Sequence, residues 1–405
     1  MQKRKVMLII PNLGRGGAQR VFWQQLDFFS GHFDTVGCVF NWDGSFESDK
    51  NRNVISLNVP AGETVFQKFF FFIARIRALR RLKKEMSINI SISHLEGADY
   101  INILSRRKEL IVCWIHGTKK HDENIEGLLG WVRKKILIPT LYRRSDKMVT
   151  VSEGIRDELI EEFALSRNKI SVVSNGFDSN HIRQLSSVSV PAQLEGIFQG
   201  VDVIATHCRL ARQKNLLALI TVFAKVREKR KARLIVLGDG ELREKLLAHA
   251  ISLRLKCLTS WNDKDYADDA DVFFLGHFDN PYPMISRSKL YLMTSMWEGF
   301  PLSLCEAMAC EVPVFAADCY TGPREILAPT INERQPVKRP FILESGVLMP
   351  LANSDIANEA WADTICKLLD DPNTLRTIGI SGSKRIMDFD LTKIQNAWLK
   401  AIDNN

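Results

Sequence analysis

Short apolar runs alternate with helix-forming segments along most of the 405-residue chain, and this alternation limits the possible folds more than any other feature. Most runs are continuously hydrophobic, which is typical of strands buried on both faces of a parallel sheet. The runs expected to form strands are Val6–Ile10, Thr35–Phe40, Ile88–Ser93, Leu110–Ile115, Lys147–Val151 and Ile170–Val173 in the first half, and Val201–Ala205, Arg233–Leu237, Val272–Leu275, Leu290–Met293 and Val312–Ala316 in the second. The length also exceeds what one hydrophobic core usually supports. The pattern therefore predicts an α/β protein with two doubly wound, Rossmann-like domains that bind ligands at the carboxyl ends of their strands.

The turn Ser174–Asp178 marks the expected domain boundary, because the stretch that follows it is polar and lacks a strong period. A new apolar run then begins at Val201, and Leu391–Ile402 has the pattern of an amphipathic helix. We predict a first domain at residues 1–180, a second domain at residues 181–385, and a C-terminal helix within residues 386–405 that packs back towards the first domain.

Positive charge is concentrated in the first half of the chain. Residues 1–200 contain 29 Lys and Arg against 21 Asp and Glu, whereas the remainder contains 26 of each, so the net charge of +8 belongs to the first half. This asymmetry indicates an anionic partner for the first domain, whether phosphate, lipid or nucleic acid.

The cysteines and the amino terminus favour a cytoplasmic protein. None of the eight cysteines forms a C-x-x-C pair, which fits reduced thiols better than disulfides or a zinc site. The first ten residues contain too short an apolar run for a secretory signal or a membrane-spanning helix.

Two cations follow the first strand expected in the second domain. Arg209 and Lys214 stand in the turn between Val201–Ala205 and a helix predicted from about Leu216. A diphosphate in this turn would meet both charges, with bidentate contacts from the guanidinium and a point charge from the amine. On its own the motif is equally compatible with a solvated basic loop. The next strand ends at Gly238 and Gly240, which could let the backbone approach a ligand closely, although many such turns bind nothing.

Two carboxylates flank the beginning of another predicted helix. Glu298 and Glu306 are separated by seven residues, and Phe300, Pro301 and Leu302 lie at the turn where this helix begins. Backbone amides at a helix N-terminus can receive phosphate oxygens, and carboxylates can accept hydrogen bonds from neighbouring sugar hydroxyls. The alternative is that both acids are ordinary loop and helix-face charges.

Taken in order, these motifs resemble glycosyltransferase family four, a retaining family with the two-domain GT-B fold, in which the domains face a cleft. The resemblance covers nearly the whole chain. The motifs that carry it are Arg209-x4-Lys214-Asn215, Leu237-Gly-Asp-Gly240, Glu298-Gly-Phe-Pro301, Glu306-Ala-Met308 and Pro313-Val314. It implies that the first domain binds the acceptor and the second binds the nucleotide sugar. It also implies that Arg209 and Lys214 neutralise the diphosphate, that Glu298 contacts the transferred sugar, and that Glu306 holds the ribose.

The first half agrees with this resemblance. A glycine-rich loop with Gly16 and Gly17 resembles the family's loop that faces the donor phosphate and the acceptor, and His116 matches a family histidine beside the donor sugar. Without that context, a lone histidine at a strand end is more often structural. One departure is Cys208, where the family commonly has glycine; cysteine is small, so we expect the turn to survive. The histidines interpreted as structural are His32, His94, His121, His181, His207, His249 and His277.

Two further segments resemble the subgroup that makes bacterial surface glycans, namely Leu275–Tyr282 and Asp318–Leu327. They favour transfer of a hexose or N-acetylhexosamine from a UDP-sugar to a lipid-diphosphate-linked saccharide. The alternatives are a lipopolysaccharide-core or small-acceptor glycosyltransferase with another nucleotide sugar, a nucleic-acid-binding protein, and a non-catalytic nucleotide-sugar-binding protein. Nucleic acid is disfavoured because no recognition pattern accompanies the basic residues. We expect no metal or other cofactor, since no D-x-D pair stands at a strand end.

A basic amphipathic pattern covers residues 64–86, where seven apolar residues recur at helical spacing among seven Lys and Arg. A second basic patch lies within residues 131–144. Such segments can bind an anionic membrane surface, or the apolar stripe can pack on the sheet with only the cations exposed. We expect both to hold, which predicts a peripheral protein on the inner face of the cytoplasmic membrane.

Overall fold

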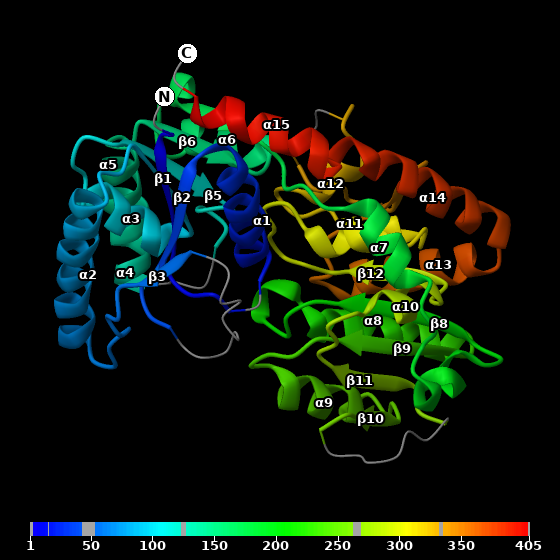
Figure 1. Cartoon of the computed structure of the whole chain (residues 1–405). Coiled ribbons are helices and arrows are strands. Elements are labelled where there is room, and N and C mark those ends of the chain that lie inside the picture. The colour runs from blue at the N-terminus through cyan, green and yellow to red at the C-terminus, as the bar shows by residue number, and fades with distance from the viewer. Residues whose placement is uncertain are drawn as a thin grey trace. The chain divides into compact units, whose positions relative to one another are not determined.

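The computed structural model of the protein describes residues 3–14, 16–42, 53–122, 127–261, 269–331 and 335–403. The chain divides into two units, one formed by Met1–Gly176 with Thr392–Asn405 and the other by Phe177–Leu391. Each unit has helices packed on a largely parallel sheet (Figure 1), so the predicted fold class of two doubly wound α/β domains is confirmed. The units change at 176/177 and 391/392, whereas the sequence analysis placed the changes at 180/181 and 385/386.

The first unit contains a seven-stranded parallel sheet with the strand order β3-β2-β1-β4-β5-β6-β7. Its strands are β1 Lys5–Ile10, β2 Asp34–Val39, β3 Val54–Ser56, β4 Ile90–His94, β5 Leu110–Ile115, β6 Lys147–Thr150 and β7 Ile170–Val172. Its helices are α1 Gly17–His32, α2 Val65–Glu85, α3 Glu96–Leu104, α4 Gly127–Val132, the π-helix η1 Arg133–Leu137, α5 Ile138–Tyr142, α6 Glu153–Glu161, the 3₁₀ helix η2 Arg167–Lys169, and α15 Leu391–Ile402.

Strand β2 shows how helices cover both faces of this sheet. A side chain at Gly37 would contact Phe22 and Leu26, so α1 packs directly on that face. The neighbouring Cys38 points the other way, into a buried cluster that includes Leu79 of α2. Successive residues of a strand face opposite sides, and here each side has its own helix layer.

The C-terminal helix α15 packs on α1 within the first unit. The indole ring of Trp398 is fully buried, with its centroid 5.7 Å from the ring of Phe28 and 6.2 Å from that of Phe29. The buried Trp398 therefore anchors α15 on α1 through its contacts with two aromatic rings.

The second unit contains an eight-stranded sheet with the order β10-β11-β9-β8-β12-β13-β15-β14, parallel except for β14. Its strands are β8 Asp202–His207, β9 Ala232–Leu237, β10 Cys257–Thr259, β11 Val272–Gly276, β12 Leu290–Met293, β13 Val314–Ala317, β14 Phe341–Leu343 and β15 Gly346–Met349. Its helices are α7 Ser179–Ser186, η3 Ala192–Phe198, η4 Arg212–Lys214, α8 Leu216–Lys229, α9 Arg243–Ser252, α10 Tyr282–Ser286, α11 Leu302–Ala309, α12 Pro323–Leu327, α13 Asp355–Leu369, α14 Pro372–Arg385 and η5 Ile386–Phe389.

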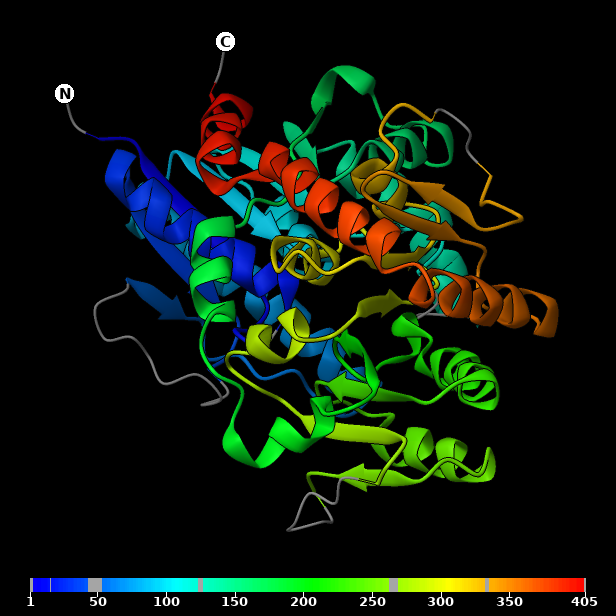
Figure 2. The ribbon, with the colours of Figure 1, turned by 90° about the vertical axis from the view of Figure 1, so that its right-hand side faces the viewer.

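Helices α13, α8 and α9 form one layer on this sheet, with α8 between the other two (Figures 1 and 2). The chain leaves β8 towards β9 and later returns to β12 on the other side of β8. The carboxyl ends of β8 and β12 therefore meet at a topological switch point, which is where open α/β sheets bind ligands.

Candidate functional site

A buried ion pair joins the loops that follow β8 and β12. The Lys214 amine donates a hydrogen bond to Glu298 Oε1 over 2.6 Å, and the Glu298 side chain is only 7% exposed. Burial by itself lowers the pKa of Lys214, but the charge and the hydrogen bond of Glu298 outweigh this effect and raise that pKa above its ordinary value. Lys214 is therefore a permanent cation beside a carboxylate at the switch point.

Hydrogen bonds to the backbone lock these two loops together. The Met296 amide donates to the Gln213 carbonyl over 2.9 Å, and Gln213 Nε2 donates to the Trp297 carbonyl over 2.7 Å. Thr294 Oγ1 donates to the Lys214 carbonyl over 3.0 Å. The positions of cation and carboxylate are thus fixed by the main chain. Sequence reasoning missed Gln213 and Thr294, because nothing in a sequence pairs residues about 80 positions apart.

The loop after β13 supports the Glu298 loop from the other side. Thr321 Oγ1 donates to the Glu298 carbonyl. Gly322 has a positive φ of 91°, and a β-carbon there would lie 2.9 Å from the Gly299 carbonyl oxygen and 2.7 Å from Pro301 Cδ. Only glycine fits this contact without a shift, so the β13 loop sets the position of the β12 loop.

The second predicted carboxylate, Glu306, faces a histidine. His207 Nε2 lies 2.6 Å from Glu306 Oε2, and both side chains are largely buried. His207 is the last residue of β8, and its main chain is bound by the hydroxyl of Tyr291. The sequence analysis interpreted His207 as structural; the structure places it directly beside a predicted site residue.

Helix α11 begins between the two acids. Its N-cap is Pro301, whose side chain cannot accept a hydrogen bond from the first amides of the helix. Leu302 is the first helical residue, so its amide lies in the turn where the N-terminal end of the helix dipole is positive. The ring of Phe300 is buried and packs edge-on against Phe389, with centroids 4.9 Å apart, so Phe300 anchors the turn.

Arg209 lies in the same loop as Lys214 but does not contact Glu298. Its guanidinium is 68% exposed and pairs with Glu241 over 3.0 Å. An exposed pair of this kind contributes at most about 1 kcal/mol. Arg209 can therefore exchange Glu241 for a phosphate at little cost.

Gly238 and Gly240 bring two turns together. A β-carbon at Gly238 would lie 1.9 Å from the Cys208 carbonyl oxygen, and one at Gly240 would lie 2.5 Å from that of Leu210. The space beside both glycines is filled by the neighbouring backbone. The sequence analysis noted that these glycines could let the backbone approach a ligand; the structure shows that they let the turn that carries Arg209 pack closely.

In the first unit, Gly16 and Gly17 mark the beginning of α1. Gly16 is its N-cap in an extended conformation with φ of −173°, and Gly17 is the first helical residue. A β-carbon at Gly16 would meet only the end of the flexible Gln19 side chain, at 2.5 Å. Neither position requires a left-handed backbone.

His116 forms a pair with a second histidine in the first unit. His116 Nε2 lies 2.9 Å from His94 Nδ1, and the rings stack with centroids 5.1 Å apart. His116 Nδ1 and His94 Nε2 are both buried without a hydrogen-bond partner. The sequence analysis singled out His116 but gave His94 a structural role, since their contact joins the ends of different strands.

This pair should make the first unit sensitive to acid. Burial, and secondarily the charge of Lys119, lower the pKa of His116 to about 3, whereas an unfolded histidine titrates near 6.5. The stability from this residue is present above about pH 6.5 and is lost as the pH falls towards 3, by up to about 1.4 kcal/mol per pH unit. We expect His116→Gln to flatten the dependence of the unfolding free energy on pH between 6.5 and 5, measured by urea denaturation.

Asp99, whose pKa burial raises to about 7, acts in the opposite direction, but it is present in both proteins and cancels in the comparison. Parallel curves for the wild type and the variant would show that His116 is protonated in the folded protein.

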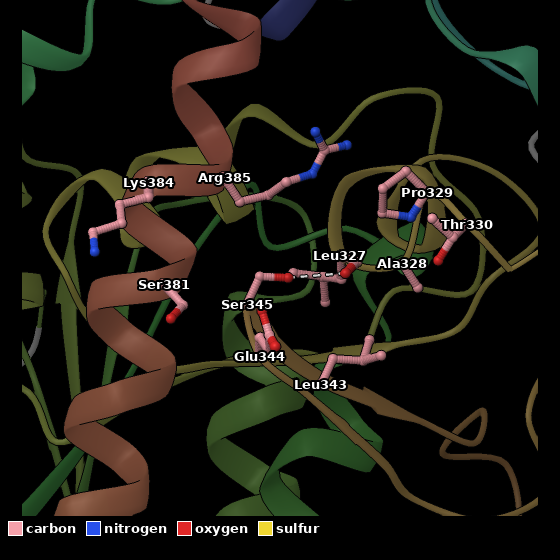
Figure 3. A pocket seen from close by; sticks show the side chains of 10 residues that line it. All are labelled: Leu327, Ala328, Pro329, Thr330, Leu343, Glu344, Ser345, Ser381, Lys384 and Arg385. Atoms are coloured by element: carbon pink, nitrogen blue, oxygen red, sulfur yellow. Dashed lines mark hydrogen bonds between the residues drawn. The ribbon is translucent and has the colours of Figure 1, made fainter.

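A separate pocket of about 640 Å³ lies in the second unit and shares no residue with this site (Figure 3). It is lined by Leu327, Ala328, Pro329, Thr330, Leu343, Glu344, Ser345, Ser381, Lys384 and Arg385. Arg385 already donates to the carbonyls of Ile326 and Glu325, and the Lys384 amine points away from Arg385. Its cations are therefore not gathered around one point as an anion would require.

In the parts of the chain that the structure describes, no helix is both long and apolar enough to cross a membrane. The same residues hold no group of three or more His, Cys, Asp or Glu side chains placed to bind a metal ion.

Two family models together match most of the chain. The model described as Glycosyltransferase Family 4 matches residues 15–181, and the model described as Glycosyl transferases group 1 matches residues 193–385. The chain is a glycosyltransferase, with a Glycosyltransferase Family 4 domain followed by a Glycosyl transferases group 1 domain. The family resemblance predicted from the sequence is therefore confirmed.

Relatives of this glycosyltransferase extend over its whole length. An uncharacterized glycosyltransferase of Methanocaldococcus jannaschii is 28% identical, over 94% of this chain and 95% of that protein. The Campylobacter jejuni N-acetylgalactosamine-N,N'-diacetylbacillosaminyl-diphospho-undecaprenol 4-alpha-N-acetylgalactosaminyltransferase is 24% identical, over 98% and 99%. The crystal structure of Anabaena HepE in complex with UDP is similar in fold, with a TM-score of 0.72 at 15% identity over 98% and 99% of the two chains. The predicted GT-B fold is confirmed.

Proposed function

We propose that this glycosyltransferase transfers a hexose or N-acetylhexosamine from a UDP-sugar to a lipid-diphosphate-linked saccharide in surface-glycan assembly, with retention of the anomeric configuration. The observation that carries the proposal is the Lys214–Glu298 pair beside the N-terminus of α11. Similarity to a C. jejuni enzyme named for a diphospho-undecaprenol acceptor, and to HepE, which binds UDP, supports the choice of substrates.

In the proposed reaction, negative charge builds on the diphosphate as the bond to the sugar breaks. Positive groups near the departing diphosphate stabilise it most in the transition state, because its negative charge increases there. In this site these groups are Lys214, Arg209 and the first amides of α11. Glu298 would accept hydrogen bonds from the transferred sugar and Glu306 from the ribose hydroxyls. These cations would supply the charge that a divalent metal supplies elsewhere, so we propose metal-independent chemistry.

The test is a panel of UDP-, GDP- and dTDP-sugars with lipid-diphosphate-linked saccharides as acceptors. We expect UDP release that depends on the acceptor, and NMR of the product should show the anomeric configuration of the donor. Release only with a lipopolysaccharide-core acceptor or another nucleotide would favour the alternative substrates. No release with any pair would argue for a protein that binds nucleotide sugars without turnover.

We also propose that the first unit binds an anionic membrane surface as a peripheral protein at the cytoplasmic face. The amphipathic stripe divides along α2: Leu79 is fully buried in the core, whereas Phe66, Phe69 and Phe70 are 80%, 66% and 61% exposed. Moving an exposed Phe side chain from water into lipid is favourable by roughly 1.5–3 kcal/mol.

A second exposed apolar segment lies on α4 and η1. Leu128, Leu129 and Trp131 are 77%, 74% and 56% exposed. Helices α2, α3 and α5 pack side by side, and η1 connects α4 to α5, so one helix layer carries both segments. A shared layer lets both segments meet the same surface.

Two of the cations counted in these segments do not face solvent, which corrects the sequence analysis. Lys83 is buried and pairs with Glu109 over 2.8 Å, and Arg133 is buried and pairs with Glu96 over 2.6 Å. The cations exposed around the apolar residues are Lys68, Arg77, Arg80, Arg81, Lys84, Lys135, Arg143 and Arg144. Each cation near an anionic membrane contributes on the order of 1 kcal/mol of attraction.

We expect the protein to sediment with phosphatidylglycerol-rich vesicles at low salt and to leave them at high salt. Replacing Phe66, Phe69 and Phe70 by serine should weaken this binding at least about tenfold, because three apolar anchors are lost. The matched control is Ile356→Ser, which removes a side chain that is 85% exposed on the second unit and should change nothing. A wild-type protein that ignores these vesicles at low salt would end the membrane proposal.

A further inference from the structure

His207 and Glu306 form a close contact whose geometry has a direct bearing on ligand binding. The 2.6 Å separation of His207 Nε2 and Glu306 Oε2 is short for a nitrogen–oxygen hydrogen bond, as expected for a charged acceptor. With Glu306 ionised, as its proposed role requires, the carboxylate only accepts and His207 donates from Nε2. His207 Nδ1 is buried with no hydrogen-bond partner.

Tyr291 supports the position of His207. The Tyr291 hydroxyl donates to the His207 carbonyl over 3.1 Å and accepts from its amide over 3.4 Å. The two rings meet edge to face with centroids 5.4 Å apart, and Tyr291 is buried in β12. Tyr291 therefore holds the main chain of His207 and packs against its ring, so the imidazole is supported by β12 as well as by its contact with Glu306.

We infer that His207 is a positioning residue that holds the Glu306 carboxylate in the orientation that receives the ribose hydroxyls of the nucleotide. This inference rests on the proposed function, in which Glu306 accepts from the ribose. A carboxylate has about four lone-pair sites, and the imidazole occupies one of them. With one oxygen held by a rigid ring, the plane of the carboxylate is fixed before the nucleotide arrives. Less side-chain freedom is then lost on binding, which strengthens recognition of a vicinal diol.

The test compares UDP with 2′,3′-dideoxy-UDP, which lacks both ribose hydroxyls, by isothermal titration calorimetry. We expect the wild type to bind UDP at least about tenfold more tightly than the dideoxy nucleotide, the equivalent of one or two good hydrogen bonds to a charged group. His207→Phe keeps the ring shape but has no donor, so most of that preference should disappear. His207→Gln keeps an amide donor and should recover part of it.

Two controls separate positioning from general damage. Binding of inorganic pyrophosphate should be unchanged in His207→Phe, because Lys214 and the α11 amides remain. In a Glu306→Gln background, His207→Phe should cause no further loss of the preference for UDP. A purely structural histidine would weaken all three ligands together.

A His207→Phe protein that keeps the wild-type preference for UDP would overturn this inference and leave the proposed function intact. If His207→Phe does not fold, the same comparison is made with His207→Gln. A preference for UDP over the dideoxy nucleotide as large as that of the wild type, with the same affinity for UDP, would show that the imidazole ring is not needed to position Glu306. A wild type that binds UDP and its dideoxy analogue equally would overturn the role of Glu306 and of His207. A wild type that binds no nucleoside diphosphate would overturn the proposed function itself.

Discussion

Turnover is expected to fall about a thousandfold or more when Lys214 is replaced by methionine, a loss of about 4 kcal/mol of transition-state stabilisation. The amine is the cation fixed most firmly beside the α11 N-terminus, because it is held by Glu298 over 2.6 Å. A fixed cation needs no reorganisation as charge develops on the leaving diphosphate, so its removal costs more than the loss of a mobile surface charge. Steady-state release of UDP from the donor identified in the panel measures the effect.

The same substitution should also reduce stability. Both side chains are largely buried, and removing one partner leaves the other charge unpaired, at a cost of about 3–5 kcal/mol. The double variant Lys214→Met with Glu298→Gln removes both charges, so urea denaturation should show partial recovery of stability without recovery of turnover.

The partly exposed pair Lys225–Glu359, 3.0 Å apart on the same unit, supplies the control. Lys225→Met should change the unfolding free energy by less than about 1 kcal/mol and leave turnover unchanged. A folded Lys214→Met enzyme with near-normal turnover would show that the Lys214–Glu298 pair takes no part in the reaction.

The strands of the central sheets could be predicted from the sequence because they are continuous apolar runs. The observed bounds of β5 and β12 coincide with the predicted ranges, and the bounds of most other predicted strands agree to within one or two residues. The strands that escaped prediction are β3, β10, β14 and β15. They have three or four residues each and lie at or next to a sheet edge, so they are specified mainly by the neighbours they pair with.

The site could be predicted only in part. Lys214, Glu298 and Glu306 follow from a motif, but their partners depend on which loops the sheet order brings together. Glu298 lies 84 residues from Lys214, and Glu306 lies 99 residues from His207. No local sequence pattern predicts a contact between residues so far apart in the chain.

The burial of Lys83 had a signal that the sequence analysis did not use. Residues four apart share a helix face, and Lys83 follows Leu79, the most deeply buried apolar residue of α2, by four. Helical periodicity therefore placed this lysine on the buried face. What the sequence could not supply was the partner, since Glu109 comes from the segment preceding β5.

Replacing Gly238 by alanine should lower the unfolding free energy of the second unit by about 3 kcal/mol or more. Gly238 has φ of 133°, a conformation that alanine rarely adopts, and its β-carbon would lie 1.9 Å from the Cys208 carbonyl oxygen. The obstructing atom belongs to backbone that is itself hydrogen-bonded to Leu237, so no side-chain rotation can relieve the contact. Urea denaturation measures the loss.

The effect should extend to activity, because the turn that must move carries Arg209 and leads into Lys214. Gly31→Ala in α1 is the control: no atom lies within 4 Å of its added β-carbon, and alanine is favoured over glycine in a helix by roughly 0.5–1 kcal/mol. Opposite signs for the two substitutions would show that backbone-to-backbone packing, rather than the loss of glycine as such, determines the result. A Gly238→Ala protein as stable as the wild type would mean that the turns after β8 and β9 are not in contact, and the fixed position inferred for the cations at the switch point would then lose its support.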